Sequence, residues 1–239
     1  MVINNPIVTD SEWLQATAVA IQNKDGGSKM EVPDFASRIE QNLQSKAVLD
    51  SVIDGSVTSI ESDVTGIMSY KFYGCTSLVS VDFPNATTIG AYTFRNCHSL
   101  EEAIFPNVTR IDDFTLQYCS KLETAVFDKA TYIGLGSFQN DTKLKNINIR
   151  NIERISASAF WSCSNLNTIV LEKRAVLDNI SAFTSCPAII YVKPEDLSWY
   201  STATNWSTLY AQDRIKSIED LTGDDLVWYQ EQLARYQAA

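Results

Sequence analysis

The chain has few of the residue types on which catalytic and metal sites depend. Its 239 residues include one histidine, His98, so a Ser–His or Cys–His catalytic pair would need this residue. None of the five cysteines stands in a close pair such as C-x-x-C, the spacing typical of zinc ligands. We therefore expect a protein without catalytic activity and without a metal or other cofactor.

Basic residues and long apolar runs are also scarce. The chain holds 19 lysines and arginines against 29 aspartates and glutamates, which gives a net charge of −10 and a pI of about 4.6. This balance, without a basic stripe, repels phosphate backbones and argues against nucleic acid as a partner. No apolar run approaches the roughly 18 residues that a membrane span needs. The first residues, MVINNPIVTDSEW, lack the basic and apolar parts of a secretory signal, so we expect no export by that route.

The five cysteines are spaced as members of a structural repeat. They stand at Cys75, Cys97, Cys119, Cys163 and Cys186, which are 22, 22, 44 and 23 residues apart. The gap of 44 residues skips one position, which Asp141 holds. Cysteines chosen for catalysis or metal binding would not keep such a step, whereas a stacked repeat would.

Apolar residues recur at fixed positions in the same repeat. Three residues before each cysteine position is an aromatic or aliphatic anchor: Phe72, Phe94, Leu116, Phe138, Phe160 and Phe183. An alternating pair such as Val81 and Phe83 has the period of a β-strand, and a second aliphatic column runs from Ile89 to Leu177. We expect a helical or 3₁₀ turn between this column and the cysteine. Because no single repeat can bury its apolar residues alone, the repeats should stack into a solenoid with a continuous interior.

The motif F-x-x-C-x-x-L-x-x-V-x-F-P-x-x-T-x-I resembles the leucine-rich repeat superfamily, specifically its BspA-like subtype. The resemblance covers about residues 56–192 and is almost unbroken from Phe94 to Ile111. It implies an α+β repeat solenoid over residues 51–192. The flanks add a helical N-terminal module over residues 1–50 and a helical C-terminal cap over residues 193–239.

The cysteines could form disulfides between neighbouring coils or remain reduced. A disulfide needs Cα atoms about 4.4–6.8 Å apart, which adjacent coils allow. The number of cysteines is odd, however, and Cys163 has no cysteine neighbour at position 141. We therefore expect buried, reduced thiols that pack as small apolar groups.

Residues 1–50 do not fit the repeat and predict a hairpin of two short helices. A T-D-S-E capping box precedes Trp13, and a D-G-G turn ends the first helix. In the second helix Phe35, Ile39 and Leu43 recur every four residues.

Part of this hairpin, from Ala18 to Ile39, is similar to a short module of bacteriophage tail-associated and virion proteins, where it often precedes repeats or fibres. The resemblance implies attachment to other virion proteins, with Trp13, Ile21, Phe35 and Ile39 as the attachment residues.

The C-terminal segment predicts a cover for the end of the solenoid. A final strand at Ile190–Pro194 is followed by the aromatic residues Trp199, Tyr200, Trp206 and Tyr210. This segment resembles the ending of many BspA-like arrays, which implies that it covers the exposed end of the core. A last helix is predicted over residues 221–239, with Leu226, Tyr229, Leu233 and Tyr236 spaced as in a coiled-coil seam. It should dock on the neighbouring cap or, over residues 222–238, join two copies into a homo-oligomer.

Two sets of outward-pointing side chains are candidate binding residues. They are Glu102, Ile104 and Val126 on the strands, and Tyr73, Tyr118 and Trp161 near the anchors. Rigid aromatic side chains lose little entropy on binding and can stack on sugars or anchor a protein contact. Near the same anchors, Tyr70, Tyr92 and Phe114 are expected to pack between coils.

These observations favour a non-enzymatic interaction protein. The N-terminal resemblance, the repeat and the missing export signal favour a bacteriophage virion component of a tail tip, baseplate or fibre, assembled in the host cytoplasm. Its solenoid would bind a host cell-surface protein or glycan, or a neighbouring subunit. The alternative is a BspA-like adhesin of the bacterial cell surface, which would require export.

Overall fold

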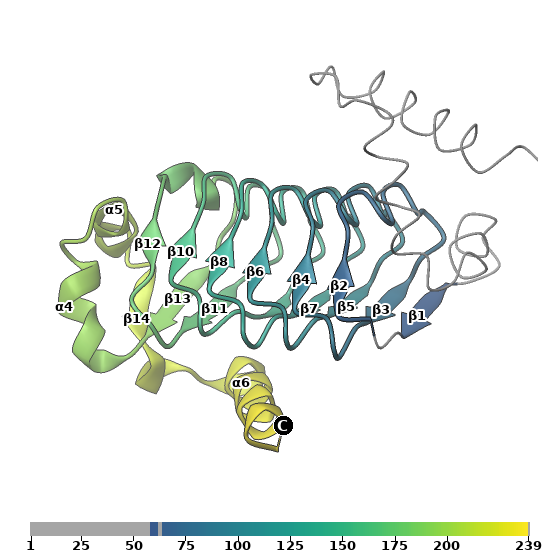
Figure 1. Cartoon of the computed structure of the whole chain (residues 1–239). Helices are drawn as coiled ribbons and strands as arrows, with labels where there is room; N and C mark the ends of the chain where they lie inside the picture. Colours follow the sequence, from purple (N-terminus) through teal and green to yellow (C-terminus); the bar gives the residue numbers. More distant parts are fainter. Residues whose placement is uncertain (1–57, 62–63, 239) are drawn as a thin grey trace, which may run out of the picture. The chain divides into compact units, whose positions relative to one another are not determined.

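The computed structural model describes residues 58–61 and 64–238, which all lie within one compact unit of the chain. Over these residues the chain winds into coils that stack in a row (Figure 1). Most coils contribute one short strand to each of two opposite sides. The predicted repeat solenoid is therefore confirmed.

One side of the solenoid is a parallel sheet of five strands, sheet A. In spatial order these are β1 (Ser59–Glu61), β3 (Ser80–Asp82), β5 (Glu102–Ile104), β7 (Thr124–Val126) and β9 (Asn146–Asn148). The middle residue of each strand is buried, as Val81 is in β3. Val81 pairs with Ala103, so the step of 22 residues in the sequence is the step from one strand to the next.

The opposite side is a second parallel sheet, sheet B, which the sequence did not predict as strands. Its members are β2 (Gly66–Ile67), β4 (Thr88–Ile89), β6 (Arg110–Ile111), β8 (Tyr132–Ile133), β10 (Arg154–Ile155) and β12 (Val176–Leu177). The second aliphatic column supplies the buried residue of each strand. Two residues are too few for an alternating pattern, so only the column was visible in the sequence.

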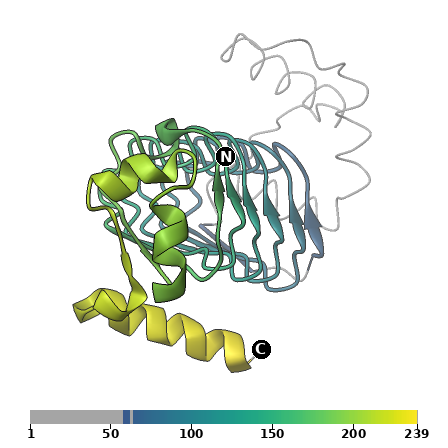
Figure 2. The same cartoon turned by 90° about the vertical axis from the view of Figure 1, so that its left-hand side faces the viewer.

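A third parallel sheet, sheet C, follows sheet A along the chain and consists of β11 (Thr168–Leu171), β13 (Ile189–Val192) and β14 (Ile215–Ser217). β13 confirms the predicted final strand, and β14 adds a strand from the C-terminal segment. The remaining elements are η1 (Ile180–Phe183), η2 (Pro194–Asp196), α4 (Leu197–Tyr200), α5 (Trp206–Ala211), η3 (Ile218–Asp220) and α6 (Gly223–Ala238). Figure 2 views the solenoid from its C-terminal end, where α4 and α5 lie across the last coils.

The interior is filled by phenylalanine rings that stack from coil to coil. In the strand column, the ring of Phe105 lies 5.6 Å from that of Phe83 and 5.2 Å from that of Phe127. In the anchor column, the rings of Phe138 and Phe160 are 5.4 Å apart. Each such pair contributes roughly 0.5–1.5 kcal/mol beyond the burial of its surface. The rings therefore reinforce the register that the strands set.

Each coil turns between sheet B and the cysteine column at a turn corner, the segments 69–75, 91–97, 113–119, 135–141 and 157–163. Turns with hydrogen bonds between residues three apart, such as Tyr73 N–H to the Tyr70 carbonyl, form this corner, which fits the expected 3₁₀ turn. In the last of the described coils the corner contains the 3₁₀ helix η1. Two positions in each turn have a positive φ angle. One column contains Tyr70, Tyr92, Phe114, Gly136 and Ser158, and the other contains Gly74, Asn96, Tyr118, Asn140 and Ser162.

All five cysteines are buried and free, which confirms the expectation of reduced thiols. The thiols of Cys97, Cys119 and Cys163 each donate to the carbonyl group 25 residues earlier, at Sγ–O distances of 3.0, 3.2 and 2.9 Å. Burial raises the pKa of Cys75 to about 12 and that of Cys186 to about 11. The column is therefore a file of neutral thiols that pack as small groups.

Asp141 takes the skipped place in this file. Its side chain is fully buried. Oδ1 accepts a hydrogen bond from the Cys119 backbone N–H at 2.8 Å, and Oδ2 has no hydrogen-bond partner. Burial raises the pKa of the Asp141 carboxyl well above its ordinary value. A buried carboxyl group with a raised pKa thus replaces a thiol in this coil.

Aromatic residues of α4 and α5 close the C-terminal end of the interior, as predicted. Tyr200 and Trp206 are fully buried, with their ring centroids 5.1 Å apart, and Trp206 lies 6.0 Å from Phe183. The Trp206 indole N–H donates to the Ala175 carbonyl at 2.6 Å, and the Tyr200 hydroxyl donates to the Lys173 carbonyl at 3.0 Å. The cap is therefore bonded to the last coil as well as packed on it.

Two further expectations concern the ends of the chain and membranes. The predicted hairpin over residues 1–50, with Trp13, Ile21, Phe35 and Ile39, lies outside the described residues and stays a prediction. Of the helices that the structure describes, none combines the length and the apolar character needed to cross a bilayer.

Replacing Trp206 tests the contribution of the cap. Trp206→Ala should lower the free energy of unfolding by about 3–5 kcal/mol, because it removes a fully buried ring and leaves a cavity. Urea unfolding followed by circular dichroism measures this loss. Tyr210→Ala is the matched control, since Tyr210 lies in the same helix with 41% of its surface exposed, and should change stability by no more than about 0.5 kcal/mol. Equal effects of the two substitutions would contradict the role given to Trp206.

Replacing Asp141 tests its protonation. The native carboxyl has a raised pKa, so above the ordinary value of 3.8 the native state keeps a proton that the unfolded chain releases. The stability of the wild type should therefore fall as pH rises from this value to the native pKa, by up to about 1.4 kcal/mol per pH unit. Asp141→Cys removes this pH dependence and restores the thiol file. The free energy of unfolding of the variant, relative to that of the wild type, should therefore increase between about pH 4.5 and pH 7. Urea unfolding of both proteins measures it, and an advantage that does not change with pH would refute a neutral Asp141.

Candidate binding surfaces

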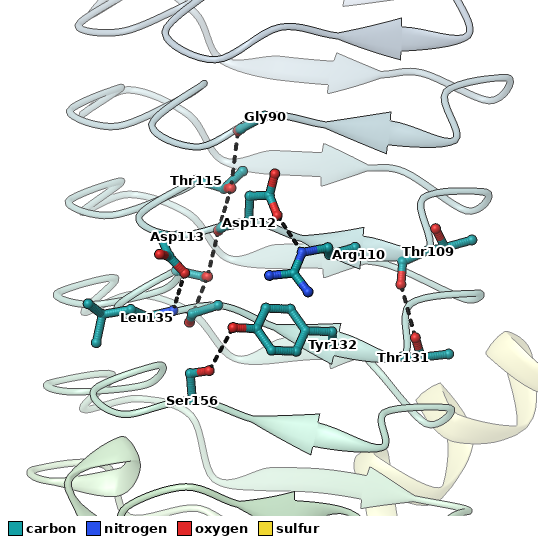
Figure 3. Close-up of polar contacts among 12 residues, drawn as sticks. Gly90, Thr109, Arg110, Asp112, Asp113, Thr115, Thr131, Tyr132, Leu135 and Ser156 are labelled. Carbon is teal, nitrogen blue, oxygen red and sulfur yellow. Dashed lines mark hydrogen bonds and ion pairs between the residues drawn. The ribbon is translucent and has the colours of Figure 1, made fainter. Parts of the chain in front are cut away.

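The outer face of sheet B carries polar side chains that bind one another (Figure 3). The Arg110 guanidinium lies 3.6 Å from the centre of the Tyr132 ring and pairs with the Asp112 carboxylate at 2.7 Å. The Ser156 hydroxyl donates to the Tyr132 hydroxyl at 3.0 Å and also lies 3.2 Å from a carboxylate oxygen of Asp178. These contacts join the coils from β6 to β12, so this face is braced by its own side chains.

Polar groups also brace the turn corner. The Thr115 hydroxyl donates to the Asp112 carbonyl at 2.7 Å, and the Ser137 hydroxyl donates to the same carbonyl at 2.9 Å from the next coil. The Asp113 carboxylate accepts a hydrogen bond from the Leu135 backbone N–H at 2.8 Å. Within residues 58–61 and 64–238, no group of three His, Cys, Asp or Glu side chains is placed to hold a metal ion.

On sheet A only one of the three candidate binding residues is open to solvent. Glu102 is exposed, Ile104 is half-buried and Val126 is 2% exposed. The expectation that Val126 is accessible is therefore wrong. The physical reason is that α6 lies along this side of the solenoid (Figures 1 and 2).

The docking of α6 on the strands differs from the expected docking on the cap. Near its start, Asp225 accepts a hydrogen bond from the Thr168 hydroxyl at 2.6 Å. One turn later the Tyr229 hydroxyl donates to Glu172 at 3.0 Å. Trp228 and Tyr229 line a cavity of about 20 Å³ with residues of β9 and β11. The sequence did show the helix, but its partner surface, which is more than fifty residues earlier, left no local signal.

The turn corner carries three exposed apolar side chains on successive coils, which we call the turn patch. They are Tyr118, Leu135 and Trp161, with exposed fractions of 38%, 38% and 41%. Backbone hydrogen bonds place them on adjacent coils: Tyr118 N–H donates to the Gln139 carbonyl, and Asn140 N–H donates to the Trp161 carbonyl. Tyr118 and Trp161 thus lie two coils apart, which is roughly 10 Å along the stack.

Tyr118 occupies a strained backbone position. Its φ angle is 64°, and the equivalent residues of the other coils are Gly74, Asn96, Asn140 and Ser162. Glycine and asparagine enter this left-handed region most readily, whereas other residues lose about 1–2 kcal/mol there. No ring contact joins Tyr118 to another aromatic residue within the described coils. Ring packing therefore gives no reason for a tyrosine at this position.

The other left-handed column is different, because its aromatic rings pack on one another. The rings of Tyr70 and Tyr92 are 4.7 Å apart, and those of Tyr92 and Phe114 are 5.1 Å apart. The Arg95 guanidinium lies 5.5 Å from the Tyr92 ring. This ladder of three stacked rings ends at Gly136, where an added Cβ would lie 2.8 Å from the Phe114 ring. The prediction that these three aromatic residues pack between coils is confirmed.

Two placements on the turn corner were not foreseen. Tyr73, a candidate binding residue, is half-buried beside this ladder, and its hydroxyl accepts a hydrogen bond from the Asn96 side chain at 3.1 Å. Leu135 is exposed, although the sequence analysis did not single it out. Its column otherwise holds small or polar residues, such as Ala91 and Asp113, and this contrast was the available signal.

The chain is similar in part to several known proteins. No protein of curated function matches the chain in sequence. A solved leucine-rich repeat protein from Eubacterium ventriosum is 22% identical over 55% of this chain and 41% of its own, with a TM-score of 0.47. A leucine-rich repeat protein from T. pallidum is 23% identical over 57% and 58%, with a TM-score of 0.40. A leucine-rich cell surface protein from Faecalibacterium prausnitzii is 18% identical over 63% and 55%, with a TM-score of 0.33. The match thus spans about half the length of these solved proteins.

The family comparison concerns the coils themselves. The model of the BspA type leucine-rich repeat region matches residues 54–167 in six copies. This range contains sheet B as far as β10 and all of sheet A, together with the cysteine file from Cys75 to Cys163. The stacked coils over residues 54–167 are therefore similar to BspA-type leucine-rich repeats.

Proposed function

We propose that the protein is a non-enzymatic binding protein of the bacterial cell surface and that the turn patch contacts its partner. The observation that carries this proposal is Tyr118, an exposed aromatic residue in a backbone conformation that disfavours it. Strained residues persist where the surroundings or a function maintain them. Since ring packing does not account for Tyr118, binding is the better explanation.

The chemistry of the turn patch fits a glycan or a protein surface. Tyr118 and Trp161 are rigid rings whose ordering on binding costs little entropy. Half-buried amide side chains of Asn96, Gln139 and Asn140 lie on the same corner, and they can donate and accept hydrogen bonds. Rings beside amides provide both stacking surface and orientation for a ligand of this kind.

The BspA-type repeat region supports the cell-surface alternative over the virion hypothesis. The virion hypothesis depends on the resemblance of residues 18–39, which lie outside the described residues.

Immunogold electron microscopy distinguishes these two locations. With an antibody to this chain, the cell-surface proposal predicts label on intact bacterial cells. Label confined to phage particles would overturn it.

Substitutions in the turn patch test the binding surface. Tyr118→Asn and Trp161→Ala should each weaken binding to whole cells and to glycan-array hits by about tenfold or more, as expected for central aromatic contacts. Tyr118→Asn should also raise stability by about 1 kcal/mol, because asparagine is favoured in the left-handed conformation. Loss of binding without loss of stability would separate function from folding.

The matched control is Val176→Ala on sheet B. Val176 is 53% exposed but lies outside the turn patch, so this variant should bind as the wild type does. Unchanged binding by both turn-patch variants would refute the assignment of the surface.

A further inference from the structure

The contact between α6 and the strands has the character of an exchangeable interface. Two hydrogen bonds hold the first half of the helix: the Thr168 hydroxyl donates to Asp225, and the Tyr229 hydroxyl donates to Glu172. Further along, Arg235 is close enough to Asp82 and Asp128 to lower the pKa of both carboxyls, although burial raises each overall. The helix therefore extends over the outer face from β11 toward β3, with polar contacts along its length.

Several polar groups are buried on this side of the solenoid. Gln232 of α6 is 5% exposed, and its Oε1 has no hydrogen-bond partner. On the strand side, Asp128 and Asn148 are 6% and 3% exposed, and the Asn148 side-chain amide donates a hydrogen bond to the Asp128 carboxylate at 2.5 Å. Burying such groups costs free energy unless every one of them is satisfied. The docked helix is thus held less firmly than an apolar helix of its length would be.

The apolar residues of α6 are incompletely covered. Val227 is 54% exposed, and Leu226, Trp228 and Leu233 are half-buried. A single copy of the chain therefore leaves apolar surface on α6 that a second copy can bury.

The segment before α6 can act as a hinge. Gly223 has a φ angle of 64°, and nothing lies within 4 Å of the place where a Cβ would be. Thr222 beside it is exposed. A redirection of α6 at this point would disturb no packed side chain of these two residues.

From these observations we propose that α6 docks on the strand face of a second copy of this chain, in an α6-exchanged dimer. The face and the helix are complementary by the contacts already described, and an exchange between two copies reproduces each contact in trans. Leu226, Val227 and Leu233, which a single copy leaves partly exposed, lie on the exchanged helix and are available for contact between the two copies. The exchange thus gives the terminal helix a defined partner, a second copy of the same chain.

Exchange has a consequence for binding that rests on the proposed function. A dimer carries two turn patches, and bivalent contact with a surface can raise the apparent affinity by about 10²–10⁴ without any new contact. Failure of the exchange would leave the binding of a single patch intact, so the two proposals can be tested separately.

Disulfide trapping between two full-length variants tests the exchange. Thr168→Cys is mixed with Asp225→Cys at high protein concentration and oxidised, and the products are separated on a non-reducing gel. The two positions contact each other at 2.6 Å, so a disulfide between different chains forms only when α6 of one copy lies on the strands of another. We expect a cross-linked dimer of the two variants and, by light scattering, a dimer of the wild type.

The controls keep the outcome decisive. Val227→Cys mixed with Thr168→Cys should give little cross-link, since Val227 lies on the exposed side of α6. The native cysteines are buried, so the wild type should give none. Glu172→Cys mixed with Tyr229→Cys provides a second pair should a variant of the first pair fold poorly. A further variant carries both Thr168→Cys and Asp225→Cys in one chain. If a disulfide forms only within this chain and not between different chains, and the wild type is a monomer, the proposal is overturned.

Discussion

The solenoid depends on one constraint: the backbone groups of each coil must meet those of the next coil at a fixed step in the sequence. Phe94 N–H donates to the Thr115 carbonyl, Leu116 N–H to the Ser137 carbonyl and Phe138 N–H to the Ala159 carbonyl, at 2.8, 2.9 and 2.9 Å. Side chains in equivalent positions are then brought together in files, which is why phenylalanine follows phenylalanine and thiol follows thiol. The same constraint repeats the left-handed turn positions in every coil, whether or not the residue there favours them.

Much of this architecture could be predicted because a file of identical side chains is visible in the sequence as a period. The interior strands, the buried cysteines and the aromatic cap over the last coil were all found in this way. Sheet B was missed because its strands are two residues long, and the burial of Val126 was missed because the covering helix comes about a hundred residues later. The strain at Tyr118 could not be inferred either, because the turn geometry that creates it is a property of the backbone. Only its exposure was anticipated.

The three sides of the coils differ in how their surfaces are used. On the outer face of sheet B the side chains bind one another, as in the ion pair of Arg110 with Asp112 and its cation–π contact with Tyr132. Sheet A is covered by α6 at its β9 end, whereas Glu102 on β5 stays exposed. Of the three sides of the described coils, the turn corner exposes the large rings of Tyr118 and Trp161. This division follows from the coil itself, since strands offer flat faces for packing while turns present single side chains to solvent.

Trp206 and α5 also determine where the array stops. A stack of equivalent coils has no inherent length, because its last coil offers an unpaired strand edge and an open ring face to any further coil, including one from another molecule. The indole of Trp206 lies next to Phe183, where the next phenylalanine of the file would lie, and covers this ring face. Gain or loss of whole 22-residue units would leave this joint unchanged, so the length of the solenoid can vary during evolution while its terminus stays the same.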